Sequence, residues 1–189
     1  RTRLELTDRA GRTQRLYLKR YGPEPPAKRF ARFIRGRGAS PAEMELRNIR
    51  AVDRAGVPTM SPVAEGHEGG CFGAGRSFLV VTEVPGEALE RCAEAHLSHG
   101  GDAAGARLAG ALGELAAALH SAGLVHRDFY ASHIFLEEVD AAPRLWLIDL
   151  ARVFRPRSRR RRWRVKDLAQ LRYSMPPLWT DRHWDALLE

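Results

Sequence analysis

The chain has 189 residues, of which 44% are hydrophobic, so it can bury one substantial core or two small lobes and does not read as disordered. Its net charge is +8, but seven arginines fall within residues 155–164, which makes the basic character a local feature. Two cysteines, Cys71 and Cys92, without CxxC spacing argue against a zinc site and a disulfide scaffold and fit a reducing compartment. The sequence also lacks a run of about 18 apolar residues, which a membrane span requires. The chain begins at Arg1 without Met or an apolar signal core, so we expect a trimmed or partial chain.

The first half of the chain reads as a small sheet with one helix. Alternating residues at 4–6 and 15–19 around a turn predict two short strands, after which Pro23, Pro25 and Pro26 are expected to interrupt regular structure. Ser40 as a cap and Pro41 at the first position predict a helix that ends at Gly56. The β-rich run at 78–84, followed by Pro85 and Gly86, predicts a further strand.

The second half reads as mainly helical. Apolar residues at helical spacing within 103–122 predict a buried helix. The apolar segments 134–136 and 145–148 predict two short strands on either side of a turn, and a last helix is expected to begin near Lys166. Together the elements indicate an α+β protein.

Two aspartates stand where loops meet short strands. Asp128 ends the sequence His126-Arg127-Asp128, between the predicted helix and a strand, and Asp149 ends the strand 145–148. Phosphoryl transfer needs one carboxylate to orient the attacking hydroxyl and another to hold Mg²⁺, so this pair suits a kinase. Either aspartate could instead cap a helix or a turn.

The same chemistry requires a cation on the nucleotide phosphates, held in place by an anion. Lys19 lies on a predicted strand and Glu45 on the helix that follows. Lys19 alone could be a solvated lysine, and Glu45 alone could be a surface residue with Glu43 as its rival. A strand lysine, a helix glutamate, an HRD loop and a strand-end aspartate nevertheless occur here in the order found in kinases.

At these residues the chain resembles the protein-kinase superfamily and, more closely, the lipopolysaccharide core kinases of the Kdo/WaaP family. The segments that carry the resemblance are LYLKRY at 16–21, Glu45 with GVPT at 56–59, FLVVTE at 78–83, HRDFYASHIFL at 126–136, IDLAR at 148–152 and VKDLAQL at 165–171. The resemblance implies a two-lobed protein-kinase-like fold. Its parts would be an N-terminal lobe at 1–82, a hinge at 83–87 and a mainly helical lobe at 88–189.

The resemblance also implies a role for individual residues. For ATP, Lys19 would bind the α- and β-phosphates and pair with Glu45, and the backbone near Glu83 and Val84 would hold adenine. The residues assigned to catalysis, metal binding and loop support are Asp128 and Arg127 as catalytic residues, Asp149 and His133 at the Mg²⁺, and His126 and Asp167 as structural residues.

Three features depart from the protein-kinase pattern. His133 stands where those enzymes place a metal-binding Asn, so either the second metal is weak or His133 only orients the loop. Leu150 and Ala151 replace the usual Phe-Gly. No glycine-rich phosphate loop precedes Lys19, which we attribute to the abrupt start of the chain.

The segment 70–77 nearly matches a GxxxxGK[ST] loop, but it precedes a predicted strand rather than a helix, so a hairpin turn is favoured.

The arginine run at 155–164 has three interpretations: a solvated loop, a nucleic-acid contact, or a contact with an anionic acceptor. Nucleic acid is disfavoured because only Trp163 interleaves with the charges and no recognition module accompanies them. Guanidinium groups suit the phosphates and carboxylates of a lipid A–core acceptor, and they could also hold the protein on an anionic inner leaflet. The acceptor-side residues are Arg159, Arg160, Arg161, Arg162 and Lys166.

The resemblance, together with these residues, implies transfer of the ATP γ-phosphate to a heptose or Kdo hydroxyl of the lipopolysaccharide inner core. The reaction would take place in the cytoplasm, at the inner membrane of a Gram-negative bacterium. Two other hypotheses stay open: a catalytically inactive kinase-like binding protein that uses its arginine run, and a kinase for another small molecule or for protein.

Overall fold

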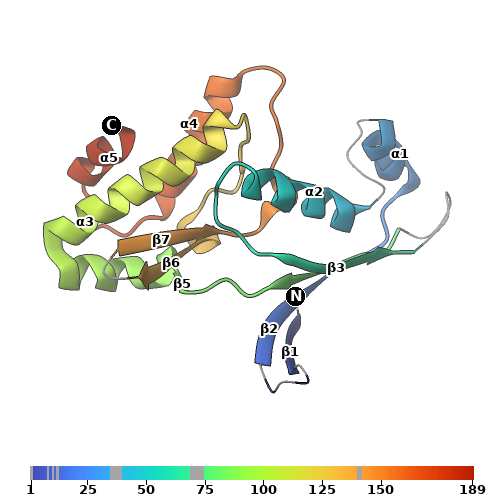
Figure 1. Cartoon of the computed structure of the whole chain (residues 1–189). Coiled ribbons are helices and arrows are strands. Elements are labelled where there is room, and N and C mark those ends of the chain that lie inside the picture. The colour runs from blue at the N-terminus through green and yellow to red at the C-terminus, as the bar shows by residue number, and fades with distance from the viewer. Residues whose placement is uncertain are drawn as a thin grey trace. The chain divides into compact units, whose positions relative to one another are not determined.

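The computed structural model describes residues 2–7, 9, 11, 13–34, 40–68, 75–139 and 142–189, which fold as an α+β protein as predicted (Figure 1). The chain divides into two compact units. The first comprises Arg1–Ala51 and Met60–Glu83, and the second comprises Val52–Thr59 and Val84–Glu189. The segment Val52–Thr59, which contains the GVPT sequence, therefore groups with the second unit.

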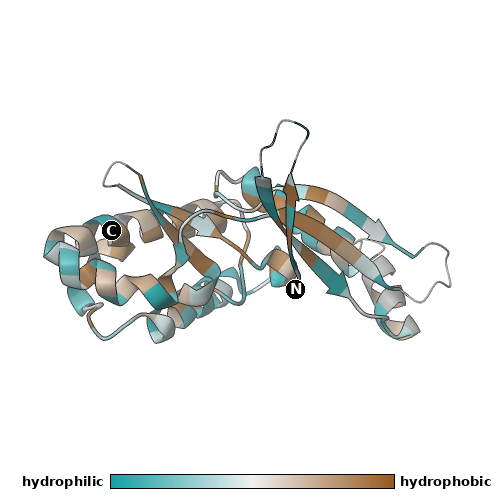
Figure 2. Cartoon of the chain, turned by 90° about the horizontal axis from the view of Figure 1, so that it is seen from below, coloured by the Kyte–Doolittle hydropathy of each residue, from teal (hydrophilic) through white to brown (hydrophobic). Residues whose placement is uncertain are grey.

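The first unit contains a four-stranded antiparallel sheet. Its strands, in the spatial order β1-β2-β4-β3, are β1 (Thr2–Thr7), β2 (Thr13–Tyr21), β4 (Ser77–Thr82) and β3 (Pro62–His67). The predicted N-terminal hairpin is confirmed, with Leu4 opposite Leu16. Sequence patterning set no bounds for β3, which has few apolar residues, but the hairpin favoured at 70–77 implies a strand before it, and β3 indeed pairs antiparallel with β4. Hydrophobic residues line the strands of this sheet (Figure 2).

The helix α2 (Pro41–Asp53) packs on one face of this sheet. Its start is the predicted one, because the Glu43 N–H donates to Ser40 Oγ at 3.0 Å, and it ends before Gly56, whose φ is 76°. The Ala42 N–H donates to Ser77 Oγ of β4 at 3.3 Å, and Ile49 is fully buried. These contacts fix which strand residues face the helix.

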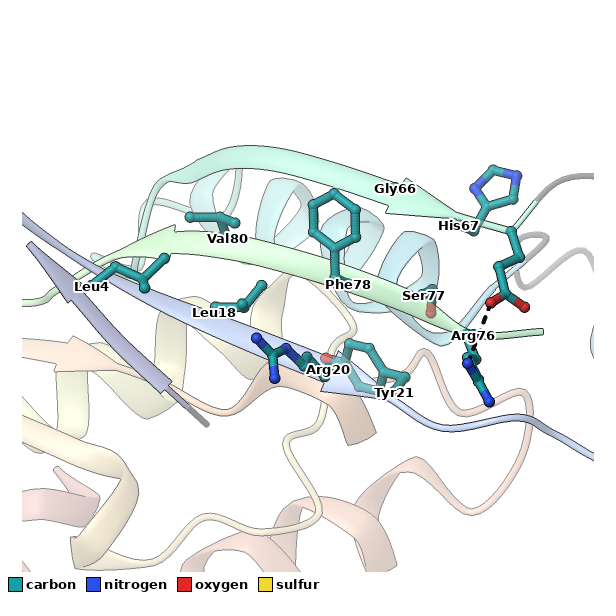
Figure 3. A pocket seen from close by; sticks show the side chains of 11 residues that line it. Leu4, Leu18, Arg20, Tyr21, Gly66, His67, Arg76, Ser77, Phe78 and Val80 are labelled. Carbon is teal, nitrogen blue, oxygen red and sulfur yellow. Dashed lines mark ion pairs between the residues drawn. The ribbon is translucent and has the colours of Figure 1, made fainter. Parts of the chain in front are cut away.

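The opposite face of the sheet carries an apolar groove of about 720 Å³ (Figure 3). Leu18 and Val80 pair directly across the strands and point into the groove. Successive residues of a strand alternate between faces, so Lys19 points to the α2 side. The pleat of β2 therefore buries the Lys19 ammonium beside the helix.

The helix α1 (Pro26–Ile34) corrects the expectation that the prolines interrupt regular structure. Pro26 occupies the first helical position, where a missing N–H costs nothing because the first N–H groups of a helix have no intrahelical partner. The prolines thus precede and open a helix instead of ending one.

The second unit combines a small antiparallel sheet with helices. The sheet has the order β5 (Glu87–Ala88), β6 (Ile134–Val139) and β7 (Ala142–Leu147), and it contains the two predicted strands. The remaining elements are α3 (Leu89–Ser121), α4 (Arg160–Ser174), α5 (Asp181–Leu188) and the 3₁₀ turns η1 (Ala131–His133) and η2 (Leu150–Arg152).

The helix α3 is longer than predicted, since it begins at Leu89 rather than near residue 103. Gly101 has φ 59° and kinks the helix, and the sequence pattern detected only the part beyond this kink. Leu108 and Leu112 are buried in the core. At Gly113 a Cβ would lie 2.7 Å from the Leu187 carbonyl oxygen, so glycine permits the close approach of α5.

The helix α4 begins at Arg160, six residues before the predicted start near Lys166. Much of the arginine run is therefore helical rather than a loop. In the part of the chain that the structure describes, no helix combines the length and apolar character needed to cross a bilayer.

Candidate active site

A buried ion pair joins β2 to α2 in the first unit. Lys19 Nζ donates to Glu45 Oε1, and both side chains are almost completely buried. The Tyr21 hydroxyl donates to Glu45 Oε2, so both carboxylate oxygens have partners. Glu43 instead pairs with Arg47, with 2.5 Å between Oε1 and the guanidinium. Of the two glutamates, Glu45 is thus the one that meets the lysine.

Glu83 lies at the end of the first unit, and its backbone N–H donates to the Arg15 carbonyl oxygen at 3.0 Å. Its side chain accepts a hydrogen bond from the Tyr17 hydroxyl at 3.1 Å. Burial, and then the neighbouring Glu83 carboxylate, raise the pKa of Tyr17. Because the Glu83 N–H already has a partner, any contact of that residue with adenine would use its carbonyl. Val84 is buried and belongs to the second unit.

The HRD loop of the second unit is held from below by the buried carboxylate of Asp167 on α4. The backbone N–H groups of His126 and Arg127 donate to its two oxygens, each at 2.8 Å, and His120 Nε2 lies 3.2 Å from Oδ2. A buried carboxylate needs such donors to offset its lost hydration. Asp167 therefore fixes the backbone immediately before Asp128.

Two further α4 residues support the loop, and the sequence analysis did not single them out. The Phe129 N–H donates to Gln170 Oε1 at 3.3 Å, and the Ala131 N–H donates to Ser174 Oγ at 2.8 Å. Asp167, Gln170 and Ser174 are spaced by three and four positions, which places them on one helix face. The signal available in the sequence was this spacing, which begins in the VKDLAQL segment and continues to Ser174.

Hydrogen bonds also connect the HRD loop to Ile148, which lies between the end of β7 and Asp149. His126 Nε2 donates to the Ile148 carbonyl oxygen at 3.0 Å, and the Ile148 N–H donates to the His133 carbonyl oxygen at 2.9 Å. Burial lowers the pKa of His126, which favours the neutral ring. Asp128 and Asp149 are therefore presented by one hydrogen-bonded frame.

The GVPT segment reinforces the same strand end. Thr59 Oγ1 donates to the Leu147 carbonyl oxygen at 2.6 Å, and the Leu147 N–H donates to the Pro58 carbonyl oxygen at 2.9 Å. These bonds fix β7 two residues before Asp149.

Two residues of this frame have left-handed backbone conformations that are uncommon for non-glycine residues: Arg127 with φ 73° and Asp149 with φ 60°. Each such residue costs about 1–3 kcal/mol and persists where the surrounding structure over-determines it, often at functional sites. The Arg127 guanidinium stacks 5.5 Å from the Phe154 ring centroid and 5.7 Å from that of Trp163. These rings hold the strained loop in place.

His133 stands between the two aspartates. Its Nδ1 donates to the Asp128 carbonyl oxygen at 2.8 Å, and its Nε2 lies 3.7 Å from Asp149 Oδ2. With Nδ1 as the donor, the Nε2 lone pair of the neutral ring is directed to the same region as the Asp149 carboxylate. Among the described residues, no cluster of three or more His, Cys, Asp or Glu side chains could hold a metal ion. Asp149 would hold a Mg²⁺ that takes its remaining ligands from phosphate and water. Imidazole is a poor Mg²⁺ ligand, and the hydrogen bond from His133 Nδ1 to the Asp128 carbonyl oxygen also fits the alternative in which His133 orients the loop.

The Asp128 carboxylate has a partner that sequence reasoning missed. Arg152 donates from its guanidinium to Asp128 Oδ1 at 2.7 Å, and the arginine side chain is half exposed. Arg152 belongs to the IDLAR segment, and only the folded η2 turn reveals that it reaches the aspartate. The arrangement places a cation beside the carboxylate that would receive the acceptor hydroxyl.

The arginines at the start of α4 oppose the helix dipole. Arg159, Arg160, Arg161 and Arg162 are exposed, and the first turn contains no acidic residue. Cations are unfavourable near the positive N-terminal end of a helix. The charge cluster is therefore not explained by helix stability, whereas a bound anion would be stabilised there.

The cysteines add no chemistry to the described site. Burial raises the pKa of the Cys92 thiol, which makes it less reactive. Cys71 and residues 70–74 of the near-match to a phosphate loop lie outside the described residues. The segment does run into β4, a strand, rather than into the helix that a phosphate loop needs.

Three comparisons relate the chain to known proteins. The sequence profile of the lipopolysaccharide kinase (Kdo/WaaP) family matches residues 14–189. The lipopolysaccharide core heptose(I) kinase WaaP of Pseudomonas aeruginosa is 35% identical over 139 residues, which are 70% of this chain and 52% of the relative. The chain thus spans about half the length of that relative. A solved structure of WaaP in complex with acyl carrier protein is similar with a TM-score of 0.70 and 30% identity, over 98% of this chain and 72% of that one.

Proposed function

This chain belongs to the lipopolysaccharide kinase (Kdo/WaaP) family, and from that premise we propose that it transfers the γ-phosphate of ATP to a heptose or Kdo hydroxyl of the lipopolysaccharide inner core. The observation that carries the proposal is the hydrogen-bonded frame that presents Asp128 and Asp149, with His133 between them. We place the reaction at the cytoplasmic face of the inner membrane of a Gram-negative bacterium. The acyl carrier protein named for the similar structure is a candidate partner of this chain as well.

In the proposed reaction, Asp128 accepts a hydrogen bond from the attacking sugar hydroxyl. The hydroxyl oxygen bonds to the γ-phosphorus, the bond from that phosphorus to the β–γ bridging oxygen breaks, and the hydroxyl proton passes to the Asp128 carboxylate. Asp149, with His133 beside it, would hold a Mg²⁺, which would supply charge neutralisation at the phosphates. Lys19, oriented by Glu45, supplies the second positive charge for the nucleotide.

The acceptor side of the proposal rests on arginines. Arg152 lies against Asp128, so a phosphate or carboxylate next to the acceptor hydroxyl could exchange with Asp128 as its partner. The exposed arginines of α4 add a second cationic surface in the same unit. A phosphorylated inner-core glycolipid offers the anionic groups that these side chains bind in bidentate fashion.

Loss of the metal carboxylate tests the nucleotide half of the proposal. Saturating Mg²⁺-ATP, at about 100 times its Kd, should stabilise the protein by about 2.7 kcal/mol, and Asp149→Asn should abolish that stabilisation and the transfer of labelled phosphate to glycolipid. Thermal unfolding and a glycolipid phosphorylation assay measure the two effects. Asp181→Asn, an exposed carboxylate on α5, is the matched control. An unchanged Mg²⁺-ATP response in Asp149→Asn would contradict the metal role, and no response in the parent protein would favour a catalytically inactive binding protein.

Neutralising the start of α4 tests the acceptor half. The double variant Arg160→Gln/Arg161→Gln should raise the KM for glycolipid about tenfold, as expected for two surface charge contacts, without lowering kcat at saturating acceptor. Its unfolding temperature should stay equal or rise, because the change removes cations from a helix N-terminus. The control is Arg107→Gln/Arg182→Gln, which removes two exposed arginines elsewhere. A loss of stability with an unchanged KM would assign the arginines a structural role.

A further inference from the structure

The helix α1 (Pro26–Ile34) exposes an apolar face. Phe30 and Ile34 are each 67% exposed, and their four-residue spacing places them on the same side of the helix. Figure 1 shows α1 set apart from α2 at one end of the first unit. In the described part of the chain, α1 makes no extensive contact with another helix or strand. Two large apolar side chains on one short helix thus remain in water.

The rest of α1 is basic. The helix sequence contains Lys28, Arg29 and Arg32 and no acidic residue. Lys28 is exposed, and two positions from Phe30 correspond to about 200° of rotation, which puts it on the opposite side of the helix. The helix is thus amphipathic, with Phe30 and Ile34 on one side and Lys28 on the other. Arg35 and Arg37 follow in the sequence, so all charged residues from 26 to 39 are basic.

This combination matches the layered chemistry of a lipid surface. An amphipathic helix with basic residues on one face and Phe or Ile on the other lies in the membrane plane, with its apolar face at the headgroup–acyl boundary. Anionic headgroups attract the basic residues, and the attraction weakens as salt screens it. A folded acidic partner could offer the same charge. A bilayer additionally offers an apolar layer beneath every anionic headgroup, without requiring a shaped pocket for two neighbouring side chains.

We propose that α1 docks the first unit on an anionic bilayer, with Phe30 and Ile34 inserted and Lys28 near the lipid phosphates. The helix contributes no residue to the candidate active site, so this surface is independent of the phosphotransfer chemistry. It is distinct from the arginine cluster of α4, which lies in the other unit. A lipid-linked acceptor would be met more often by a protein held at the membrane in this way.

Vesicle binding without nucleotide tests the proposal. The purified protein should co-sediment with vesicles of phosphatidylglycerol and phosphatidylethanolamine, and bind phosphatidylcholine vesicles much less. Phe30→Ser/Ile34→Ser should lower the partition coefficient on anionic vesicles about tenfold or more, because both apolar contacts are lost. The matched control is Tyr173→Ser/Leu188→Ser, which removes two exposed apolar residues, 86% and 66% exposed, from α4 and α5. Both variants should unfold at the temperature of the parent protein, since the replaced side chains are exposed.

The possible outcomes separate membrane docking from other uses of α1. Equal vesicle binding by the α1 variant and the control variant would overturn the proposal. Intact vesicle binding combined with lost binding to acyl carrier protein, or with a changed oligomeric state by light scattering, would assign the face to a protein partner or a second copy and also overturn it. The α1 variant should phosphorylate an acceptor without lipid chains, which is not held in a membrane, at the same rate as the parent protein. Failure of vesicle binding can therefore be told apart from failure of the kinase proposal.

Discussion

Replacing Asp128 with Asn should lower kcat by about 10²–10⁴-fold, the range for losing a group that takes a proton in the transition state. The KM for ATP should change little, because Asp128 faces the hydroxyl rather than the nucleotide in the proposed reaction. Asn keeps the shape of Asp and one oxygen that can still accept the hydrogen bond from Arg152. The fold should therefore persist while proton acceptance fails. Steady-state kinetics with a glycolipid acceptor and thermal unfolding measure the two consequences.

The control for this variant is chosen to reproduce the loss of one paired carboxylate. Asp181 pairs with Arg172 at 3.0 Å on the surface, so Asp181→Asn removes the same charge from an Asp–Arg pair that is more exposed. Its kcat should match that of the parent protein. If Asp128→Asn retained kcat within about threefold, Asp128 would not be the proton acceptor, and the phosphotransfer proposal would lose its central residue.

The parts of the fold and site that the sequence predicted share a local signal. The β1–β2 hairpin follows from residue alternation, and the start of α2 follows from Ser40 and Pro41. Lys19 and Glu45 were paired because the strand and the helix come in a recognisable order, although nothing in the spacing required their contact. Both side chains are buried in one small unit, and a buried charge is costly unless it is paired with an opposite charge, so the two side chains form an ion pair.

The parts that the sequence missed depend on tertiary contacts or on conflicting local preferences. Arg152 reaches Asp128 only because η2 turns the chain back after Asp149. The early start of α4 was missed because a run of arginines gives no local signal for a helix start and opposes the helix dipole. Burial of Asp167 and Leu171 on α4 nevertheless holds the helix against the rest of its unit. The prolines before α1 read as breakers, although Pro26 is compatible with a first helical position. In each case packing or a position-specific rule overrode the average preference of the residue.

Variants of the buried Lys19–Glu45 pair should change the free energy of unfolding and the kinase activity independently of each other. Lys19→Met leaves the Glu45 carboxylate buried without its ammonium partner, and breaking a buried pair from one side costs about 3–5 kcal/mol of unfolding free energy. The Tyr21 hydroxyl still donates to Glu45, so the loss of unfolding free energy should lie toward the lower end of this range. The double variant Lys19→Met/Glu45→Met should recover most of that stability, because apolar residues of similar volume replace a buried pair at little cost. Urea unfolding of the single and double variants gives these values and their coupling energy.

Among these single and double variants, nucleotide binding should not rise when the free energy of unfolding recovers. The double variant restores packing but presents no cation to the phosphates, so its Mg²⁺-ATP stabilisation and its kcat should stay as low as those of Lys19→Met. Arg47→Met/Glu43→Met, which removes an exposed pair from the same helix, should leave both properties intact. Recovered activity in the double variant would mean that the pair only holds β2 against α2. Recovered stability without recovered activity would mean that the buried Lys19 ammonium serves nucleotide binding, although it does not make the fold more stable than an apolar pair would.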